Sequence, residues 1–331
     1  MKALFYLGPR KLELKEVEEP KDKDRVIVKV LEAGVCGTDI KTFLRGHHLF
    51  KPPTILGHEC YGVIVEKPSF LEDVKIGDHV VVAPYAECSV CEKCRSGFPE
   101  LCEKKTYISS GCFAQYITIS VQHSLRGLFK VKEPGRQIVL AEPLACVIGT
   151  IRKFPNGKHI LIVGGGVMGA LFAIYLSTKG VHVEIVEPFE WRMAFLRDLG
   201  FHVVKPGSLE EGNYDTIVIA VTIDEPFQYL DALRDGGRLI LFGGYPKDRR
   251  LTLDPYHLHY REVTISGSFG YSLPDFAEAL EELGKEKELY AKLVTHNYSL
   301  FEYDKAFERA LNKECMKVSL GMWESEETGA P

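Results

Sequence analysis

A glycine-rich turn between an apolar strand and a helix is the feature that most constrains this chain. Gly164, Gly166 and Gly169 form the pattern G-x-G-x-x-G in the segment VGGGVMGALFA, directly after the apolar run HILIV. The first glycine permits a tight turn, the second lets backbone approach a pyrophosphate, and the third lets the helix pack closely on the strand. With Val167 and Met168 opening the helix, the motif predicts a dinucleotide-binding βαβ unit whose helix N-terminus faces the phosphates.

Alternation of strands and helices continues around this motif. HVEIVE, YDTIVIAV, RLILFG and VTISGSF have the composition of buried strands, and residues 167–179, 190–199 and 226–234 have helical patterns. Such repetition indicates right-handed βαβ units and a parallel sheet. We therefore expect an α/β protein with a doubly wound coenzyme domain at residues 149–270.

The rest of the chain has a different pattern. RVIVKVLEAGV, YGVIVE, HVVVAPY and AQYITIS are β-like runs without regular helices between them. After the coenzyme segment, helical patterns at 274–284 and 303–311 accompany the apolar runs LVTHNYSL and MKVSLGM. Because 331 residues exceed what one hydrophobic core usually supports, we expect a second, mostly β domain formed by residues 1–148 and 271–331.

An acidic residue near the end of the second strand bears on the choice of coenzyme. Glu187 lies about 20 residues after the glycine-rich turn, where a carboxylate accepts hydrogen bonds from the adenosine ribose and repels the 2′-phosphate of NADP. Arg192 is close enough in sequence to approach a 2′-phosphate. The pattern favours NAD over NADP.

Four cysteines form a compact metal motif. Cys88, Cys91, Cys94 and Cys102 have the spacing C-x2-C-x2-C-x7-C in a polar segment with little to bury. Four thiolates at this spacing can surround one tetrahedral Zn²⁺ with no water left on it. An iron–sulfur cluster and disulfides are the competing interpretations, and we expect a structural zinc that orders the loop.

Composition excludes several classes of protein. Hydrophobic residues make up 45% of the chain and charged residues 26%, which is typical of a soluble globular protein. A formal net charge of -5 argues against nucleic acid as a partner. The odd count of nine cysteines is unlike a disulfide framework. No secretory signal and no apolar run of about 20 residues is present, so we expect a cytoplasmic protein without a membrane partner.

A second set of metal-binding side chains is spread over the first half of the chain. Cys36 lies in GVCGTD, His58 and Glu59 lie in GHE, and Glu142 lies in EPLAC. Each residue alone is more often a packed or solvated side chain. Together they offer thiolate, imidazole and carboxylate ligands, which suit a zinc ion with one position open for water or substrate.

The order of these motifs resembles the zinc-containing medium-chain alcohol dehydrogenases. GVCGTDI, ILGHE, IGDHVVV, the four-cysteine segment, EPLAC and GGGVMG follow one another as in that family, over nearly the whole chain. The chain is most similar to the sorbitol (polyol) branch, whose members have Glu where alcohol-specific members have Cys at the position of Glu142. The resemblance implies a GroES-like, partly open β-barrel catalytic domain beside a Rossmann coenzyme domain, with an association into homodimers or homotetramers.

The resemblance also implies roles for individual residues. Cys36 and His58 are expected as ligands of a catalytic zinc, with either Glu59 or Glu142 as the third. Thr38 is expected to take the alcohol proton while hydride passes from a secondary alcohol of a polyol or sugar-like substrate to NAD, giving a ketone. Two zinc ions per chain follow, one catalytic and one structural.

Further positions match the surroundings of the substrate and coenzyme in the family. Gly111, Phe113 and Tyr271 correspond to positions near the substrate cleft. Cys146 is expected beside the nicotinamide, and a buried packing cysteine is the alternative.

Three positions depart from the polyol pattern. Lys41 replaces the usual His three residues after Thr38, and an ordinary Lys pKa of about 10.4 is too high for easy proton relay near neutrality. We therefore expect Lys41 to bind substrate oxygens or ribose, and His47 or His48 to relay the proton. Pro68 replaces a glycine in a shortened surface loop. Gly270 replaces the Arg that precedes the aromatic position in polyol members, which disfavours sorbitol itself.

Several alternatives remain open from the sequence. A threonine, a glucose, a simple secondary alcohol or an acidic hydroxy compound could be the substrate within the same scaffold. The loop LRGHHLFKPP, with Arg45, His47 and His48, could face a hydroxylated or acidic substrate, or only solvent. A non-catalytic zinc- and dinucleotide-binding protein is the alternative from a different class, and the retention of all the expected ligands argues against it.

Overall fold

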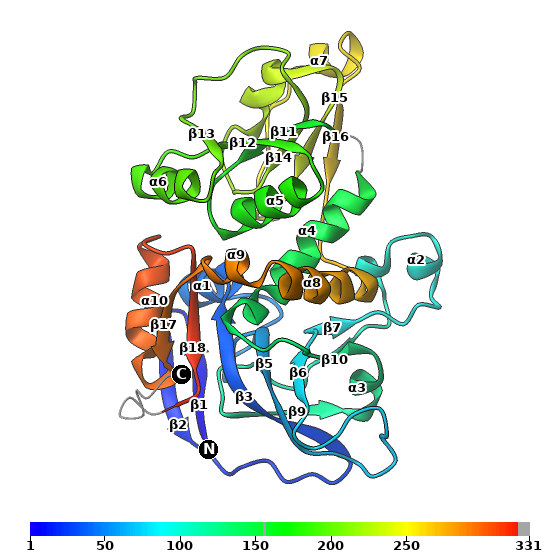
Figure 1. The fold of residues 1–331 in the computed structure, drawn as a ribbon, viewed down its shortest axis with the longest axis vertical. Helices are drawn as coiled ribbons and strands as arrows, with labels where there is room; N and C mark the ends of the chain where they lie inside the picture. The colour runs from blue at the N-terminus through cyan, green and yellow to red at the C-terminus, as the bar shows by residue number, and fades with distance from the viewer. Residues whose placement is uncertain (155–156, 324–331) are drawn as a thin grey trace. The chain divides into compact units, whose positions relative to one another are not determined.

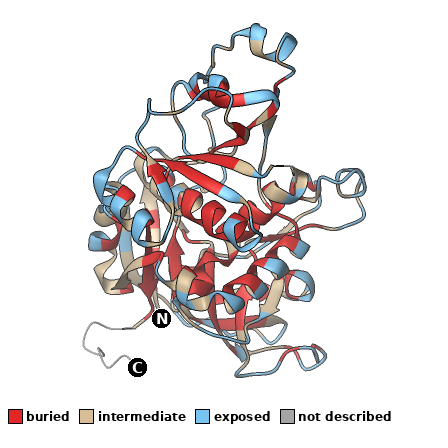
Figure 2. Cartoon of the chain, turned by 45° about the horizontal axis from the view of Figure 1, so that its top comes forward, coloured by how far each residue is buried: buried red, intermediate tan, exposed pale blue. Residues whose placement is uncertain are grey.

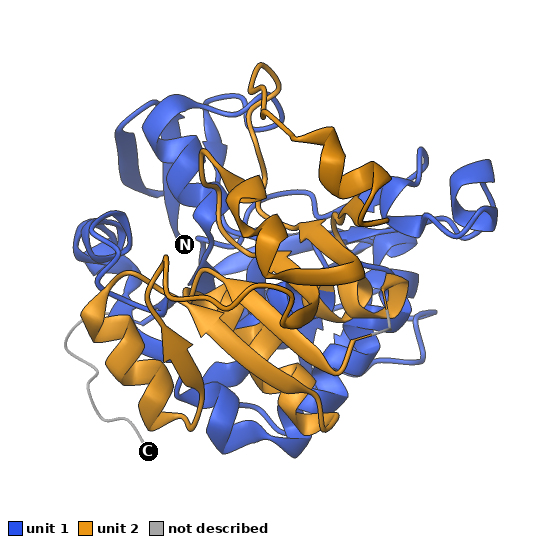
Figure 3. Ribbon diagram, turned by 90° about the horizontal axis from the view of Figure 1, so that it is seen from above, with its two compact units in different colours: residues 1–145, 271–331 blue, residues 146–270 orange. Residues whose placement is uncertain are grey.

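Contacts within a computed structural model, which describes residues 1–154 and 157–323, divide the chain into two units. Unit 1 comprises Met1–Ala145 and the segment that begins at Tyr271, and unit 2 comprises Cys146–Gly270 (Figure 3). The division falls inside helix α4 (Ala141–Lys153). The expected boundary after Ile148 lies in the same helix.

Unit 2 is built on a six-stranded parallel sheet with the order β13-β12-β11-β14-β15-β16. Strand order reverses beside β11 (His159–Val163), so the loop that follows β11 opens at a topological switch point, where ligands of such sheets bind. Helices α5 (Val167–Thr178) and α6 (Glu190–Asp198) follow strands β11 and β12 along the chain (Figure 1). The other elements are β12 (His182–Val186), β13 (His202–Val204), β14 (Tyr214–Ile219), η3 (Pro226–Ala232), β15 (Leu233–Leu241), α7 (Pro255–His259) and β16 (Thr264–Gly267).

The doubly wound coenzyme fold expected from the alternation is confirmed, but the prediction of one α-helix is wrong. Residues 226–234 were expected as an α-helix, whereas the structure has a 3-10 helix, η3, that ends at Ala232, and strand β15 begins at Leu233. Its buried residues are Pro226, Tyr229, Leu230 and Ala232, a spacing that an α-helix would also give. The segment is only seven residues long and leads directly into β15, and 3-10 helices are used as short connectors of this kind.

Unit 1 is centred on a seven-stranded, mostly antiparallel sheet. Its path runs β10-β6-β5-β3-β18-β17, and β9 pairs with β3. The remaining short sheets are β2-β1-β4 and β7-β8. The strands are β1 (Lys2–Gly8), β2 (Lys11–Glu16), β3 (Arg25–Val35), β4 (Thr54–Ile55), β5 (Glu59–Glu66), β6 (His79–Val82), β7 (Tyr85–Ala86), β8 (Thr106–Tyr107), β9 (Tyr116–Ser120), β10 (Leu128–Lys130), β17 (Val294–Ser299) and β18 (Lys317–Gly321).

The C-terminal segment completes this sheet. Strand β18 pairs antiparallel with β3 and parallel with β17, which confirms that the last part of the chain returns to the first domain. Figure 2 shows buried residues along the strands of both units and exposed residues along the loops. The helices of unit 1 besides α4 are α1 (Gly37–Arg45), α2 (Glu92–Arg95), η1 (Pro99–Leu101), α3 (Val121–Gly127), η2 (Arg136–Leu140), α8 (Leu273–Lys285), α9 (Lys287–Ala291), η4 (Leu300–Glu302) and α10 (Tyr303–Leu311).

Helices α1 and α4 were not expected from the sequence. Both begin within segments that were interpreted for their metal ligands rather than for their periodicity. Among the described residues, no helix combines the length and the apolar character that crossing a bilayer requires.

Candidate metal centres and coenzyme loop

Cys36 is held at the start of helix α1 by a capping box. Its Sγ accepts a hydrogen bond from the backbone N–H of Thr38 at 3.4 Å, and the carboxylate of Asp39 accepts one from the backbone N–H of Cys36 at 2.9 Å. Reciprocal bonds of this kind satisfy donors that a helix N-terminus leaves without partners. The capping box therefore fixes the thiol at the N-terminus of helix α1.

Asp39 connects this helix to the segment that carries His58. Its buried carboxylate accepts a hydrogen bond from the backbone N–H of Gly57 at 3.2 Å and lies 3.6 Å from Nδ1 of His58. A carboxylate on one ring nitrogen of a histidine orients the other nitrogen toward a metal. Asp39 was not recognised from the sequence, although its position three residues after Cys36 is the spacing of a capping box.

Cys36, His58 and Glu59 converge. One ligand atom from each lies within 4.8 Å of the others. Glu59 is 2% exposed, and its Oε1 has no hydrogen-bond partner. Because a buried carboxylate oxygen without a hydrogen-bond partner is costly, its presence in a residue beside two other possible metal ligands fits a bound cation. The donor set and this oxygen are consistent with zinc.

The charges around His58 favour a cation at this place. Burial alone would lower the pKa of His58, but the neighbouring Asp39 and Cys36 raise it well above its ordinary value. Surroundings that stabilise an imidazolium also stabilise a bound divalent ion, which then takes over the role of the proton.

Lys317, from strand β18, forms a fully buried ion pair with Glu59. Gly34 of strand β3 pairs with Glu59 across the sheet and with Ser319 on the other side. A Cβ at Gly34 would collide with Oε2 of Glu59 and come within 2.8 Å of Cε of Lys317. Glycine at this position therefore leaves the space in which the two side chains meet, and neither Gly34 nor Lys317 was singled out from the sequence.

Glu142 lies in the first turn of helix α4 and is half-buried. It is not part of the group of donor atoms formed by Cys36, His58 and Glu59 in the described chain. Of the two carboxylates that were expected as the third ligand, the structure brings Glu59 to the group.

The four cysteines expected to bind structural zinc also converge, with their sulfur atoms within 4.8 Å of one another. Backbone N–H groups of Cys88, Cys91 and Lys104 point at these sulfurs at 3.3 Å. Hydrogen bonds from Cys94 and Glu103 backbone lower the pKa of Cys91 to about 6. Such bonds stabilise thiolates, which are the form that binds zinc.

A cation is needed before all four thiols of this segment can ionise. Burial, followed by the neighbouring Cys91 and Cys102, raises the pKa of Cys94 to about 12. A divalent ion in the centre removes this penalty, because a coordinated thiol is deprotonated outright. The geometry and charges therefore fit the tetrahedral zinc that the spacing predicts.

One disulfide joins Cys60 to Cys112. The odd count of cysteines argued against a disulfide framework, and this single bridge was not expected. It ties strand β5, one residue after Glu59, to the segment that carries Gly111 and Phe113.

In unit 2 the glycine-rich loop has the expected form. Gly164 has φ of 102°, a conformation that other residues rarely adopt, and Gly166 is the N-cap of helix α5. A Cβ on Gly169 would collide with the carbonyl oxygen of Gly164, so the third glycine permits the close approach of helix and strand. Val167 and Met168 open the helix, with their N–H groups at its N-terminus.

Glu187 is buried behind this loop rather than simply exposed at a strand end. Its Oε2 accepts a hydrogen bond from the backbone N–H of Gly165 at 2.8 Å, and its Oε1 accepts one from Phe189 at 2.9 Å. Arg192 lies 4.0 Å from the same carboxylate and 3.9 Å from the Cβ position of Gly166. A carboxylate has further lone pairs, so Glu187 can fix the loop and still accept from a ribose hydroxyl.

The residues expected to relay a proton follow Cys36 along helix α1. Thr38 is half-buried, and the hydroxyl of Thr42 donates to its carbonyl at 2.8 Å. Lys41 lies on the next turn and is exposed, while His48 lies in the loop after the helix and is also exposed.

Other residues expected near the substrate are mostly packed. Phe113 is fully buried, and Tyr271 stacks on Tyr85 with ring centroids 4.3 Å apart, so neither presents surface to a substrate in this structure. A Cβ on Gly111 would collide with the carbonyl oxygens of Ile55 and Leu56. Cys146 is half-buried, and its carbonyl accepts from Thr150.

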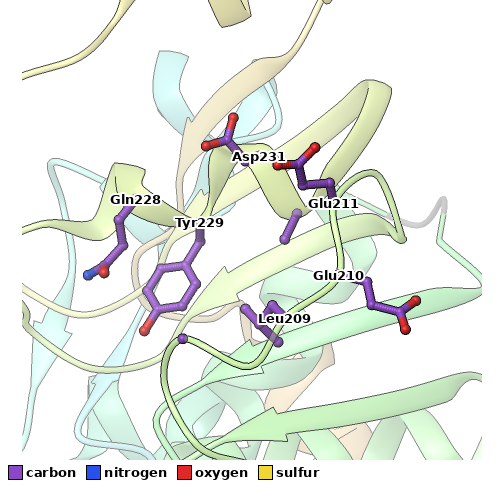
Figure 4. Close-up of a pocket in the computed structure, with 8 residues that line it drawn as sticks. Leu209, Glu210, Glu211, Gln228, Tyr229 and Asp231 are labelled. Atoms are coloured by element: carbon purple, nitrogen blue, oxygen red, sulfur yellow. The ribbon is translucent and has the colours of Figure 1, made fainter.

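A pocket in unit 2 is unrelated to these residues. Glu210, Glu211, Tyr229 and Asp231 are among the side chains that line it, and Figure 4 shows the carboxylates of Glu211 and Asp231 near one another. Three carboxylates repel the phosphates of a dinucleotide. The pocket contains none of the residues that the sequence singled out.

In comparisons with known proteins, two segments of the chain match models of dehydrogenase domains. Residues 22–132 match the model of the alcohol dehydrogenase GroES-like domain, and residues 167–285 match that of the zinc-binding dehydrogenases. D-altritol 5-dehydrogenase from Agrobacterium fabrum is 31% identical over 83% of this chain and 85% of that protein. D-arabinitol dehydrogenase 1 from Uromyces fabae is 28% identical over 97% of both chains. The structure of an alcohol dehydrogenase from Thermotoga maritima has a TM-score of 0.85 at 23% identity, covering 97% of this chain and 98% of that one.

Proposed function

Because the chain belongs to the zinc-containing medium-chain alcohol dehydrogenases, near their polyol branch, we propose that it oxidises a secondary alcohol of a polyol or sugar-like substrate with NAD. Hydride passes from the carbinol carbon to the nicotinamide and the hydroxyl proton passes to the protein, so the products are a ketone, NADH and a proton. The convergence of Cys36, His58 and Glu59 carries this proposal.

These three residues would hold the catalytic zinc, which when bound supplies Lewis-acid chemistry. Glu59 is the proposed third ligand, because its Oε1 has no other partner and its Oε2 is paired with Lys317. Glu142 is the alternative third ligand. Glu59→Gln and Glu142→Gln variants distinguish them, since the true ligand is the one whose loss lowers the zinc content.

Thr38 is the proposed acceptor of the alcohol proton. Its backbone N–H donates to Sγ of Cys36, so the residue lies on the first turn of α1, next to one of the metal donors. Asp39 holds His58 by one ring nitrogen and so keeps the other available. Lys41 binds substrate oxygens or ribose, and His47 or His48 passes the proton on.

NAD is the proposed hydride acceptor. The buried carboxylate of Glu187 is fixed by Gly165 and Phe189 beside the glycine-rich loop, where it disfavours a 2′-phosphate. Arg192, next to it, is the feature that supports NADP as the alternative. The four-cysteine segment is proposed to hold a second, structural zinc, and a homodimer or homotetramer is proposed from the family alone.

Zinc analysis and initial rates test the proposal together. Two zinc ions per chain and a chelator-sensitive reduction of NAD with a polyol are expected, with NADP reduced more slowly. The panel includes sorbitol, xylitol, galactitol, threonine, glucose and butane-2,3-diol. A protein that binds a single zinc and reduces neither coenzyme with any compound would instead be a non-catalytic member of the fold.

A further inference from the structure

A row of cationic side chains begins next to the proposed proton acceptor. In an α-helix each residue advances by about 100° around the axis and about 1.5 Å along it. Thr38, Lys41 and Arg45 therefore lie within about 60° of one another on helix α1, and both cations are exposed. Lys41 lies about 4.5 Å and Arg45 about 10 Å along the axis from Thr38.

The loop after the helix extends this row. It contains His47, His48 and Lys51, and the rings of the two histidines lie 4.5 Å apart. The ring of His47 also lies 5.1 Å from Phe50, and its Nδ1 accepts from the backbone N–H of Leu49 at 3.2 Å. Phe50 packs against the core of unit 1 and so anchors the backbone of the loop.

The segment that carries these cations supplies no exposed acidic side chain of its own. Between Asp39 and Glu59 the sequence contains no Asp or Glu. Asp39 itself is buried and bonded to Cys36 and Gly57. Within residues 1–154 and 157–323 neither Lys41, Arg45 nor Lys51 forms an ion pair, whereas other surface cations of unit 1 do, among them Lys2, Arg25 and Lys130.

The positive charge of the row comes from Lys41, Arg45 and Lys51. Burial, then the charges of His48 and Arg45, lower the pKa of His47, so its ring adds no positive charge near neutral pH. Clustered like charges repel one another, and a row of them without a counter-charge attracts an anion. Arg45 can bind a carboxylate or phosphate with two parallel hydrogen bonds, which gives orientation as well as affinity.

Resting on the dehydrogenase function proposed above, we propose that the substrate carries a carboxylate or phosphate besides the oxidised alcohol, and that Lys41 and Arg45 bind this anionic group. Lys41 and Arg45 lie beyond Thr38 along helix α1, on the side farther from Cys36. A short hydroxylated chain with its alcohol at Thr38 therefore extends its charged end along α1.

Matched substrates test this inference with the zinc-loaded full chain and NAD. Each neutral polyol (sorbitol, mannitol, galactitol) is compared with the aldonate and the terminal phosphate of the same carbon skeleton. We expect KM for one anionic class to be at least about tenfold lower than for its neutral counterpart, because only the anion can form charge-assisted hydrogen bonds with Lys41 and Arg45. When the NaCl concentration is raised from about 0.02 M to about 0.2 M, the KM of the anion should increase, because salt screens exposed charges. The class with the lower KM identifies the anionic group as a carboxylate or a phosphate.

Variants connect the effect to the row. Lys41→Gln and Arg45→Gln should each raise KM for the anionic substrate about tenfold. Lys23→Gln removes an exposed cation elsewhere in unit 1 and should leave KM unchanged. Calorimetric titration of the zinc-loaded protein with the anion, without coenzyme, should show binding that Arg45→Gln weakens.

The outcomes separate this inference from the proposed function. Equal KM values for neutral and anionic compounds, without a salt effect, overturn the anionic substrate and leave the dehydrogenase intact. If the two variants raise KM for NAD and leave KM for the substrate unchanged, the row binds the coenzyme. This result also overturns the anionic substrate. If no compound is oxidised, the proposed function fails, and calorimetric binding of the anion that depends on Arg45 still supports an anion site.

Discussion

The two proposed zinc centres of unit 1 are built in different ways. The four-cysteine centre takes all its donors from residues 88–102, and backbone N–H groups from residues 88–104 donate to the sulfurs of Cys88 and Cys102. The Cys36 centre takes its donors from a helix N-terminus and a strand, with Asp39 between them and Lys317 supplied by the last strand. The first centre therefore depends on local sequence, and the second depends on the assembled sheet.

Loss of one ligand should mainly lower the rate at the Cys36 centre and mainly lower the thermal stability at the four-cysteine centre. Cys36→Ser is expected to remove one zinc and lower kcat/KM at least about 1000-fold, because Lewis-acid stabilisation amounts to several kcal/mol. The melting temperature should change little. Zinc content, rates and a thermal melt of the same preparation measure all three.

Cys94→Ser is the matched variant in the other centre. It should also remove one zinc, but it should lower the melting temperature by about 5–10 °C, as expected for a few kcal/mol in a domain of this size, and affect the rate less. Identical behaviour of the two variants would remove the distinction between a catalytic and a structural centre.

Lys317→Met tests how far the Cys36 centre depends on distant strands. It leaves the carboxylate of Glu59 buried without its partner, and breaking such a pair costs about 3–5 kcal/mol of the free energy of unfolding. Urea denaturation measures this quantity. Lys305→Met is the control, because its ion pair with Glu302 lies at the surface, where solvent screens the attraction and its loss should change the free energy of unfolding little. Equal costs for both variants would show that Lys317 does not stabilise Glu59.

Asp39→Asn sharpens the comparison at the level of a single hydrogen-bond partner. Asparagine keeps only one of the two oxygens that accept from the N–H groups of Cys36 and Gly57, so it weakens this connection and also removes the charge beside His58. We expect zinc affinity and kcat/KM to fall about 10–100-fold, the usual effect of losing a carboxylate behind a histidine ligand. Competition with a chelator measures the affinity, and an unchanged affinity would contradict the role given to Asp39.

A chelator should remove zinc from the two centres of the unaltered protein at different rates. The Cys36 centre keeps an open position, whereas four thiolates leave none, so the first zinc should be removed faster by on the order of tenfold. Activity should disappear with the first phase of zinc release. If activity were lost only in the second phase of zinc release, the slowly released zinc would be the catalytic one, and the roles given to the two centres would be reversed.

The same contrast explains what the sequence could predict. The glycine-rich loop, the strands of unit 2 and the four-cysteine segment depend on local periodicity and spacing, and the structure places them as expected. Helix α1 was missed because its capping residue is a cysteine, an unusual N-cap that was interpreted only as a ligand. The α-helix predicted at 226–234 was wrong because the buried residues Pro226, Tyr229 and Leu230 have a spacing common to both kinds of helix, so the pattern did not reveal a short 3-10 connector.

Sequence reasoning missed the supports of the Cys36 centre for a physical reason. Lys317 and Gly34 are far from Glu59 along the chain and meet it only when strands β3, β5 and β18 pair. A buried Lys and a strand Gly have no local pattern that distinguishes them from ordinary sheet residues. Asp39 was accessible, since the spacing from Cys36 to Asp39 is that of a capping box.

The bridge between Cys60 and Cys112 gives the four-cysteine segment a particular topology. Its ends are 52 residues apart, and residues 88–102 lie entirely within the ring that it closes. By chain entropy, a ring of this length removes about 4 kcal/mol of freedom from the unfolded chain. When zinc leaves, the segment is therefore released as part of a closed ring rather than as a free arm. The entropy that must be lost to bind zinc again is correspondingly smaller, because part of it is already removed by the covalent closure.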